Sequence, residues 1–426
     1  MKKSKQILST LLVLLSALNL TACARNQSRI VMMEGTQEKT TIHLLTNTRN
    51  MWNLKAFETA ISSFKADRPD VEVDFEGYSN SESSKSIAQI IDERMAAGLV
   101  EDLATMDVAN IFRYANTGDL LDLTDTEAAE NMTEMARADS SVNGRVMSVP
   151  LAMVSYGMYV NMDLLKECNL DLPTNWEEFI HCCQILQENG HQPIVGTNTY
   201  PKLFVLAAMG DIYISEDTEE IIKRLNSGEE KISKYAGEGF EHLAYLIEKG
   251  YINGPAAYEV EPGNLNELFK TGEEGAFVLA TSNHLSPKEL PFDIAFIGIP
   301  GTQGMVSLLA SDRRIVVMAD SKSPDICTEF LSYLGHQDVW DSLPEMFGLI
   351  PAYTTITSNN KKDKRLEQVY ENIESGRKML IQDYNLLFEQ WGNMDDICDP
   401  MLLGATAREQ SAAFDRLQQE AIDAAK

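Results

Sequence analysis

Nine polar and aromatic residues on predicted loops and strand ends carry the most chemistry in this sequence. They are Asn47, Arg49, Trp52, Asp107, Asn110, Tyr156, Tyr200, Asn283 and Trp391. Carboxylate, amide and guanidinium groups hydrogen-bond to hydroxyl groups, whereas aromatic rings stack against the apolar faces of sugar rings. Together these residue types suit a noncovalent binding site for a ligand with hydroxyl groups and apolar faces, as a carbohydrate has.

Motifs of the common enzyme classes are absent from the sequence. It contains no P-loop, no G-x-G-x-x-G, no G-x-S-x-G and no H-E-x-x-H. Acidic pairs such as Asp395 and Asp396 carry little information, because 64 acidic residues make chance pairing near certain. An extracytoplasmic glycoside hydrolase stays open as an alternative, since its two carboxylates are defined by their separation in space. We favour binding without catalysis, with no cofactor.

The charge of the chain restricts its partners. The formal net charge is −28, and after the N-terminal lysines the main short basic run is at residues 361–365. Nucleic-acid binding needs a basic face, so DNA and RNA are not expected as partners. A second alternative for the ligand is a polyamine or another cation, which the acidity and the pair Asn283 and His284 suggest.

The first 22 residues have the pattern of an export signal. Three lysines precede an apolar run from Ile7 to Leu20. A run of about 14 residues is too short to cross a bilayer, which needs about 20. The run ends in Leu-Thr-Ala-Cys at Cys23, and residues 24–40 show no periodicity and are interpreted as a tether.

The remaining cysteines do not indicate a disulfide framework or a metal site. Five follow Cys23, and an odd number cannot pair completely. Cys182 and Cys183 are adjacent on a predicted helix and point to different sides, so they suit small buried hydrophobes better than metal ligands.

The first part of the chain predicts a βαβ unit. Residues 41–46 alternate as a strand, apolar positions at helical spacing follow over 54–64, and a second strand is expected over 71–75. Such units form parallel sheets, whose ligands bind at the carboxyl ends of the strands. The loop after Thr46 and the loop after a strand ending at Met106 should therefore share one edge.

The stretch from Asn143 to Phe179 looks like a connection between two lobes. A turn at Asn143 and Gly144 precedes a strand that should end at Pro150, because proline lacks the N–H of a sheet ladder. A second strand is expected over 155–161, and Thr174 with Glu177 has the spacing of a capping box.

Several motifs resemble those of the ABC-transporter extracellular solute-binding proteins of family 1, the carbohydrate-binding type. The matching residues are Gly144, Pro150, Tyr156, Asn161, Asp163 and Leu164, then Asp102, Leu103, Asp107, Gly118, Leu120 and Leu123, and finally Phe269, Gly272 and Ala276. Val160 stands where the family has a second tyrosine, and Phe277 replaces the usual methionine. The sequence before Cys23 resembles the bacterial lipoprotein signal.

The resemblance implies a periplasmic-binding-protein-like type II α/β fold, with two α/β lobes joined by a three-segment hinge and a cleft between them. Lobe 1 would comprise 41–151 and 298–355, and lobe 2 would comprise 152–297 and 356–426. The second and third connections are expected at 292–300 and 348–358. Within lobe 2, Tyr384, Phe388 and Trp391 recur at the spacing of one helical face.

The resemblance also implies a mode of action. The protein would capture a mono- or oligosaccharide by closing its lobes, and would deliver it to an ABC permease in the membrane. It would be a monomer, held by a lipid on Cys23 at the extracytoplasmic face of the cell membrane. In the family the loop that carries Asp107 touches the ligand; the same residue also suits a helix N-cap, and both roles can hold together.

Overall fold

The computed structural model describes residues 39–47, 54–78, 85–99, 101–260, 264–270, 275–285, 290–343, 348–357, 364–383, 385–388 and 390–426. The predictions for Cys23, Arg49, Trp52 and Tyr384 fall outside these residues. None of the helices within them is both long and apolar enough to cross a membrane.

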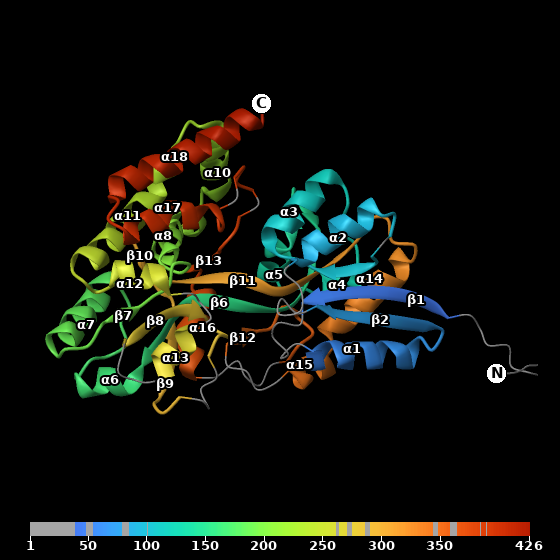
Figure 1. The fold of residues 1–426 in the computed structure, drawn as a ribbon, viewed down its shortest axis with the longest axis horizontal. Helices are drawn as coiled ribbons and strands as arrows, with labels where there is room; N and C mark the ends of the chain where they lie inside the picture. Colours follow the sequence, from blue (N-terminus) through green and yellow to red (C-terminus); the bar gives the residue numbers. More distant parts are fainter. Residues whose placement is uncertain are drawn as a thin grey trace, which may run out of the picture. The chain divides into compact units, whose positions relative to one another are not determined.

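Most strands of the described residues form one mixed sheet, flanked by helices (Figure 1), whereas β4 (Ser141–Val142) and β5 (Arg145–Val146) form a separate antiparallel pair. The main path of the mixed sheet runs in the order β2-β1-β3-β11-β6-β8-β7. These strands are β2 (Val71–Tyr78), β1 (Thr40–Asn47), β3 (Leu103–Thr105), β11 (Gly304–Val317), β6 (Val149–Asn161), β8 (Phe277–Thr281) and β7 (Ile194–Val195). Four short strands join the sides of β6 and β11: β9 (Ile294–Ile297), β10 (Ile299–Gly301), β12 (Leu349–Ile350) and β13 (Lys378–Leu380). The predicted α/β class is confirmed.

The predicted βαβ unit is also confirmed. β1 and β2 pair in parallel from Thr40 opposite Val71 to Asn47 opposite Tyr78. Between them α1 (Leu54–Asp67) buries one apolar face that includes Phe57 and Phe64.

Both faces of this part of the sheet are covered, as strand alternation requires. Leu44 and Leu103 belong to the main core with α1, whereas Leu45 and Ala104 pack with a second cluster. Two helices supply that cluster: α2 (Ile87–Ala96) and α3 (Val108–Thr117).

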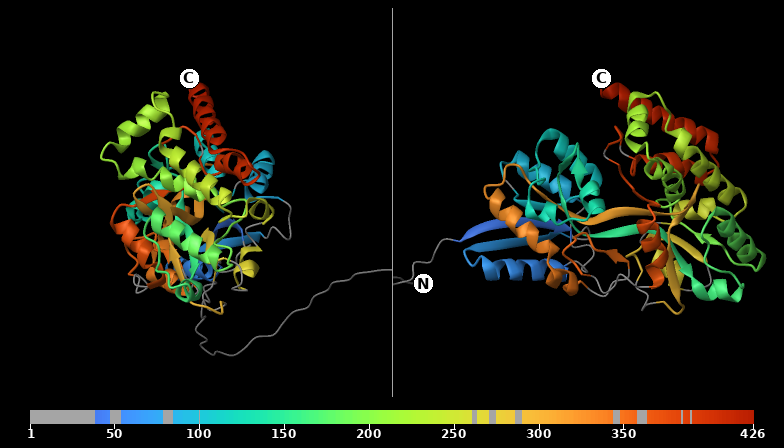
Figure 2. Two further views of the ribbon diagram at one scale, coloured as in Figure 1. Left: turned by 90° about the vertical axis from the view of Figure 1, so that its left-hand side faces the viewer. Right: turned by 180° about the vertical axis from the view of Figure 1, so that it is seen from behind.

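The other helices gather around the two ends of the sheet (Figures 1 and 2). Near β1 to β3 lie α4 (Glu127–Glu130), α5 (Glu134–Asp139), α14 (Pro324–Ser332) and α15 (Gln337–Ser342). Near β7 and β8 lie α6 (Met162–Glu167), α7 (Trp176–Glu188), α8 (Lys202–Ala208), α11 (Ser233–Glu248), α12 (Gly254–Glu259) and α13 (Leu265–Lys270). The chain also forms α9 (Asp211–Ile214), α10 (Thr218–Ser227), α16 (Glu367–Glu374), α17 (Asn393–Leu402) and α18 (Ala407–Ala424).

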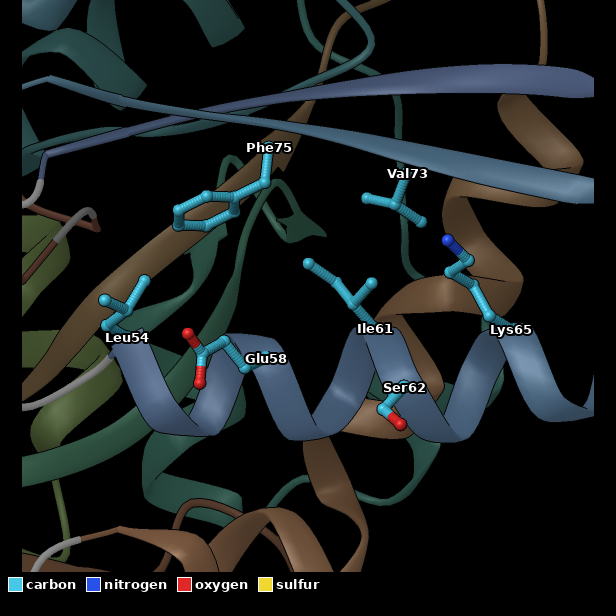
Figure 3. A pocket seen from close by; sticks show the side chains of 7 residues that line it. All are labelled: Leu54, Glu58, Ile61, Ser62, Lys65, Val73 and Phe75. Carbon is cyan, nitrogen blue, oxygen red and sulfur yellow. The ribbon is translucent and has the colours of Figure 1, made fainter.

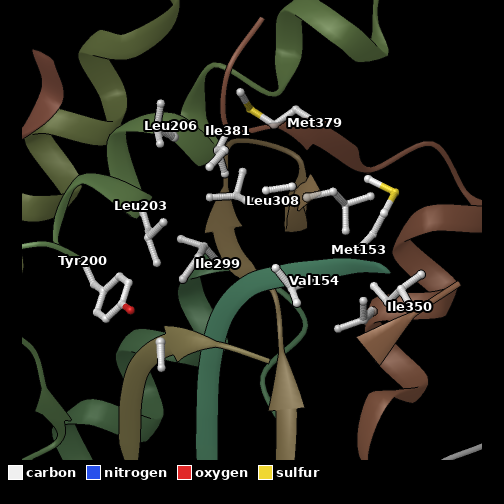
Figure 4. Packing of buried hydrophobic residues seen from close by; sticks show 14 of the residues in the cluster. Met153, Val154, Tyr200, Leu203, Leu206, Ile299, Leu308, Ile350, Met379 and Ile381 are labelled. Atoms are coloured by element: carbon white, nitrogen blue, oxygen red, sulfur yellow. The ribbon is translucent and has the colours of Figure 1, made fainter. Parts of the chain in front are cut away.

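Two long strands run between these groups of helices (Figure 2). β6 and β11 pair antiparallel from Tyr156 opposite Leu308 to Val149 opposite Ile315. β11 then pairs with β3, and β6 pairs with β8 at its other end. The main core continues along these strands: Val154 and Leu308 belong to the same buried cluster as Leu203 of α8 (Figure 4).

Two predictions for residues 143–179 are wrong. β6 runs through Pro150 as one strand, because Pro150 is its second residue and suits extended geometry. The Pro150 carbonyl accepts a hydrogen bond from the Tyr353 hydroxyl at 2.6 Å. The N-cap of α7 is Asn175, whose side chain accepts from the Glu178 N–H at 2.9 Å. Glu178 rather than Glu177 folds back, accepting from the backbone N–H and the hydroxyl of Thr174.

The connection expected at 292–300 holds two short strands, β9 and β10. A further prediction, in the C-terminal part of the chain, is also wrong. Residues 385–388 form turns and bends instead of a helix. Phe388 is buried against Phe414 of α18, whereas Trp391 lies against Tyr156, so the two rings do not share a helical face.

Candidate functional site

A pocket of about 480 Å³ opens at the carboxyl end of β3, at the start of α2 and α3. It is lined by Ser86, Ile87, Ala88, Thr105, Met106, Asp107, Asn110, Val154, Tyr156, Thr281, Asn283, Ser311, Asp312, Arg313 and Arg314. Four residues predicted from the sequence are among them: Asp107, Asn110, Tyr156 and Asn283. Strand ends, helix starts and the two long strands therefore meet here, where open α/β sheets bind ligands.

Asp107 and Asn110 lie on the helical side of the pocket. Asp107 is the N-cap of α3, and its carboxylate accepts from the Asn110 N–H at 2.9 Å. The Asn110 side-chain amide also donates to both carboxylate oxygens, at 3.0 and 2.8 Å. Asp107 is exposed and its carboxylate can accept further hydrogen bonds, so capping and ligand contact are compatible.

Asn283 and Asp312 form a second polar pair, on the strand side of the pocket. The Asn283 amide donates to Asp312 Oδ2 at 3.0 Å, and Asp312 Oδ1 accepts from the Arg313 N–H at 2.9 Å. Asn283 follows β8 and Asp312 belongs to β11, so the pair links two strands that are not neighbours in the sheet.

Arg313 and Arg314 bring two guanidinium groups to the pocket. Arg314 Nη2 donates to Asp139 Oδ2 at 2.6 Å, and this carboxylate also accepts from the Ser311 N–H at 2.8 Å. The Asp139 side chain is wholly buried and that of Arg314 is 9% exposed, so a buried ion pair fixes the position of the guanidinium. Arg313 has a left-handed backbone, with φ of 53°, a conformation that is costly for a residue with a side chain.

Sequence reasoning did not select Asp139 or the three charged residues of β11. The available signal was the run Asp312, Arg313 and Arg314 inside the otherwise apolar stretch from 308 to 319. Charges at such a position need partners or a polar cavity, and here they have both.

An aromatic group adjoins the pocket through Tyr156. The Tyr156 ring lies edge-on to Trp391, with centroids 4.7 Å apart, and 6.4 Å from the ring of Tyr200. Tyr156 and Trp391 are half-buried, whereas Tyr200 is buried, and this burial raises the pKa of the Tyr200 hydroxyl to about 12. Thus six of the nine predicted residues lie in the pocket or in this aromatic group.

The other three predicted residues are not placed in the site. Asn47 ends β1, where its backbone pairs with Tyr78 of β2, and Arg49 and Trp52 lie outside the described residues. Among the residues that the structure describes, no group of three or more His, Cys, Asp or Glu side chains is arranged to hold a metal ion.

A second hollow, of about 440 Å³, lies between α1 and β2 (Figure 3). It is lined by Leu54, Glu58, Ile61, Ser62, Lys65, Val73 and Phe75. All of these come from two consecutive elements, and none was selected from the sequence. Distant segments do not converge there, in contrast to the pocket beside β3.

Comparison with known proteins identifies the family. The model of the family described as bacterial extracellular solute-binding protein matches residues 52–337, about two thirds of the chain. The protein belongs to this family. Solute binding outside the cytoplasm is the property that defines its members.

Individual relatives agree with this assignment. The multiple sugar-binding protein of Streptococcus mutans is 22% identical over 354 residues, which cover 78% of this chain and 79% of that protein. The apo form of RafE from Streptococcus pneumoniae superposes with a TM-score of 0.70 at 17% identity, covering 90% of this chain and 98% of RafE. A sugar transporter from Bacillus licheniformis, solved with stachyose, has a TM-score of 0.65 at 18% identity, covering 89% of this chain and 99% of that one.

Proposed function

We propose that the protein captures a carbohydrate, a mono- or oligosaccharide, in the pocket beside β3. The observation that carries the proposal is that an aromatic group lies next to carboxylate, amide, guanidinium and hydroxyl groups. The Tyr156 and Trp391 rings offer apolar surface to a sugar face, and Asp107, Asn283 and Arg313 can bind its hydroxyl groups. The multiple sugar-binding protein, the sugar transporter solved with stachyose and RafE solved with raffinose support this ligand class.

A cationic solute fits the pocket less well, although the chain is acidic. Two guanidinium groups line the pocket together with the carboxylates of Asp107 and Asp312. A polyamine would have to approach Arg313 and Arg314, and like charges repel at short range. The pocket lining therefore has no excess of negative charge, although the whole chain is acidic.

A thermal-shift comparison tests the ligand class. Raffinose and stachyose should raise the unfolding midpoint, because a ligand at 100 times its Kd stabilises the native state by about 2.7 kcal/mol. Spermidine should leave the midpoint unchanged, and Tyr156→Ala should reduce the shift with sugars to about half or less. A shift with spermidine alone would overturn the carbohydrate proposal.

The non-enzymatic part of the proposal needs its own measurement. Stachyose incubated with the protein for hours should be recovered intact by chromatography. More than one equivalent of released sugar per protein would assign the site to a glycoside hydrolase instead.

Closure is proposed as the mechanism of capture. The proposed lobes are 41–151 with 298–355 and 152–297 with 356–426, and β6 runs without a break from the first into the second. The pocket takes Asp107 from one side and Tyr156 and Asn283 from the other, so a ligand that contacts both sides favours a closed state. Small-angle scattering should show a smaller radius of gyration with stachyose, and an unchanged radius would contradict closure.

The cellular setting is proposed from the N-terminal sequence and the family. The chain would be lipidated at Cys23, remain at the outer face of the cell membrane, act as a monomer and pass its sugar to an ABC permease. Cys23→Ser should release the protein from membranes, and mass spectrometry should find acyl chains only on the unaltered protein.

A further inference from the structure

Lys202 is a fully buried cation next to the aromatic group. It is the first residue of α8 and is 1% exposed. Its ammonium donates to the Trp391 carbonyl at 2.9 Å and pairs with Asp395 at 2.6 Å. The same nitrogen lies 3.6 Å from the centroid of the Trp391 ring. A buried ammonium is costly unless such partners compensate its charge, so the position of the Lys202 ammonium depends on Trp391 and Asp395.

These contacts act on a part of the chain that has no regular structure of its own. Trp391 lies in a turn ahead of α17, and its backbone N–H reaches the Gln382 side chain at 3.3 Å. Lys202 holds both the carbonyl and the ring of this residue, whereas Asp395 fixes the ammonium from the first turn of α17. Trp391 is thereby attached to two helices.

The orientation of Trp391 affects the pocket through its contact with Tyr156. Its ring lies edge-on to Tyr156 at 4.7 Å, and Tyr156 lines the pocket. A ring that tilts or moves at Trp391 would leave Tyr156 without its neighbour on that side. A cation on an aromatic face is favoured most where water is excluded, as it is here.

We propose that Lys202 is a positioning residue, which sets the Trp391 ring and through it the aromatic surface offered by Tyr156. This inference rests on the proposed carbohydrate function for its effect on affinity. Its effect on Trp391 itself does not depend on any ligand, so the two can be tested separately.

The ligand-free test uses 5-fluorotryptophan and 19F NMR. The chain has four tryptophans, and Trp391→Phe identifies the resonance of Trp391 by its loss. Lys202→Met should shift or broaden that resonance and leave the other three in place. Lys249→Met is the matched control, because Lys249 lies 5.4 Å from the Tyr245 ring and does not line the pocket. A Trp391 resonance that is unchanged in Lys202→Met overturns the proposal.

The affinity test uses calorimetry with stachyose in two backgrounds. Lys202→Met should weaken binding by about tenfold in the otherwise unaltered protein, the size expected for a lost aromatic contact. It should change the affinity by less than about twofold in a Trp391→Ala background, because a positioning residue acts through its target. Equal weakening in both backgrounds would show that Lys202 acts without Trp391 and would overturn the proposal.

Two further outcomes are informative. If Lys202→Met does not fold, Asp395→Ala replaces it in both tests. Asp395→Ala removes the carboxylate partner of the ammonium, and the Asp395 side chain is 40% exposed. Unchanged spectra and affinity in Asp395→Ala would overturn the inference. If the Trp391 resonance moves while the unaltered protein binds none of the sugars, the positioning of Trp391 stands and the carbohydrate function fails.

Discussion

Single side chains at the pocket serve the fold and the proposed ligand together. Asp107 caps α3 and faces the pocket, and Arg314 enters the pocket from a buried ion pair. Their rotamers are fixed before any ligand arrives, which lowers the entropy that binding must overcome.

Tyr156 is the residue on which we expect binding to depend most directly. Tyr156→Ala should weaken stachyose binding by about tenfold or more, because it removes the ring that touches both the pocket and Trp391. Tyr156→Phe keeps the ring and should bind within a few-fold of the unaltered protein. Calorimetry measures both, and equal losses would show that the hydroxyl matters more than the ring.

Asp139 should matter for stability more than any exposed charge. Asp139→Ala leaves Arg314 without its buried partner, so unfolding in urea should show a loss of about 3–5 kcal/mol. Glu93→Ala is the control, since its pair with Lys85 is exposed and should contribute less than about 1 kcal/mol. Similar losses in the two variants would mean that the buried pair is no more important than a surface pair.

At the scale of elements, helix packing around α8 positions one wall of the aromatic group. α8 begins at Lys202, two residues after Tyr200, and packs against α11. Close approach of these helices depends on Gly239 of α11, where a Cβ would lie 2.5 Å from Val205 Cα and 2.6 Å from the Phe204 carbonyl.

Two glycines of α11 should therefore respond in opposite ways to the same substitution. Gly239→Ala should destabilise the protein by about 1–3 kcal/mol or more, because the added methyl meets the backbone of α8. Gly237→Ala meets nothing within 4 Å and should stabilise by up to about 1 kcal/mol, through helix propensity. Thermal unfolding of the two variants measures the difference, and a stabilising Gly239→Ala would disprove the close packing.

At the scale of the whole molecule, the sheet is the common support. β6 and β11 belong to a sheet that reaches from β2 to β7, and the pocket lies beside both strands. The main buried cluster extends along them, so global stability and pocket geometry depend on the same core.

One buried imidazole should contribute less to stability in mild acid than at neutral pH. His242 stacks on Trp176 with centroids 3.6 Å apart, and burial lowers its pKa to about 4, although the nearby Glu177 acts in the opposite direction. The unfolded chain binds a proton at His242 from about pH 6.5 downward, whereas the folded protein binds it only near pH 4. This contribution is therefore fully present above pH 6.5 and is lost as the pH falls toward 4.

A comparison with His242→Gln isolates this effect from those of other titrating groups. One of these is Asp399: burial raises its pKa to about 6, so its contribution to stability increases as the pH falls. Between pH 7.5 and pH 5 the unaltered protein should lose ~2 kcal/mol more of its free energy of unfolding than His242→Gln. Urea unfolding at the two pH values gives the difference, and parallel losses would show that His242 does not titrate as described.

Local pattern was sufficient for much of the fold. The helix at α1, the parallel pairing of β1 with β2, and the N-cap role of Asp107 all follow from periodicity and capping chemistry, which act over a few residues. Strand-end logic was also sufficient to place Asp107 and Asn110 at a pocket, because the carboxyl ends of strands in an open α/β sheet form its binding edge.

Contacts between distant segments were decided only by the tertiary structure. Pro150 continues a strand because its missing N–H is tolerated near the start of β6, where Tyr353 from far along the chain bonds its carbonyl. Trp391 leaves its expected helix and meets Tyr156, and Lys202 is buried beneath it, which no local spacing indicates. Residue types and short-range periodicity in the sequence thus determined the elements and the kind of ligand to expect, whereas long-range packing decided which side chains share the site.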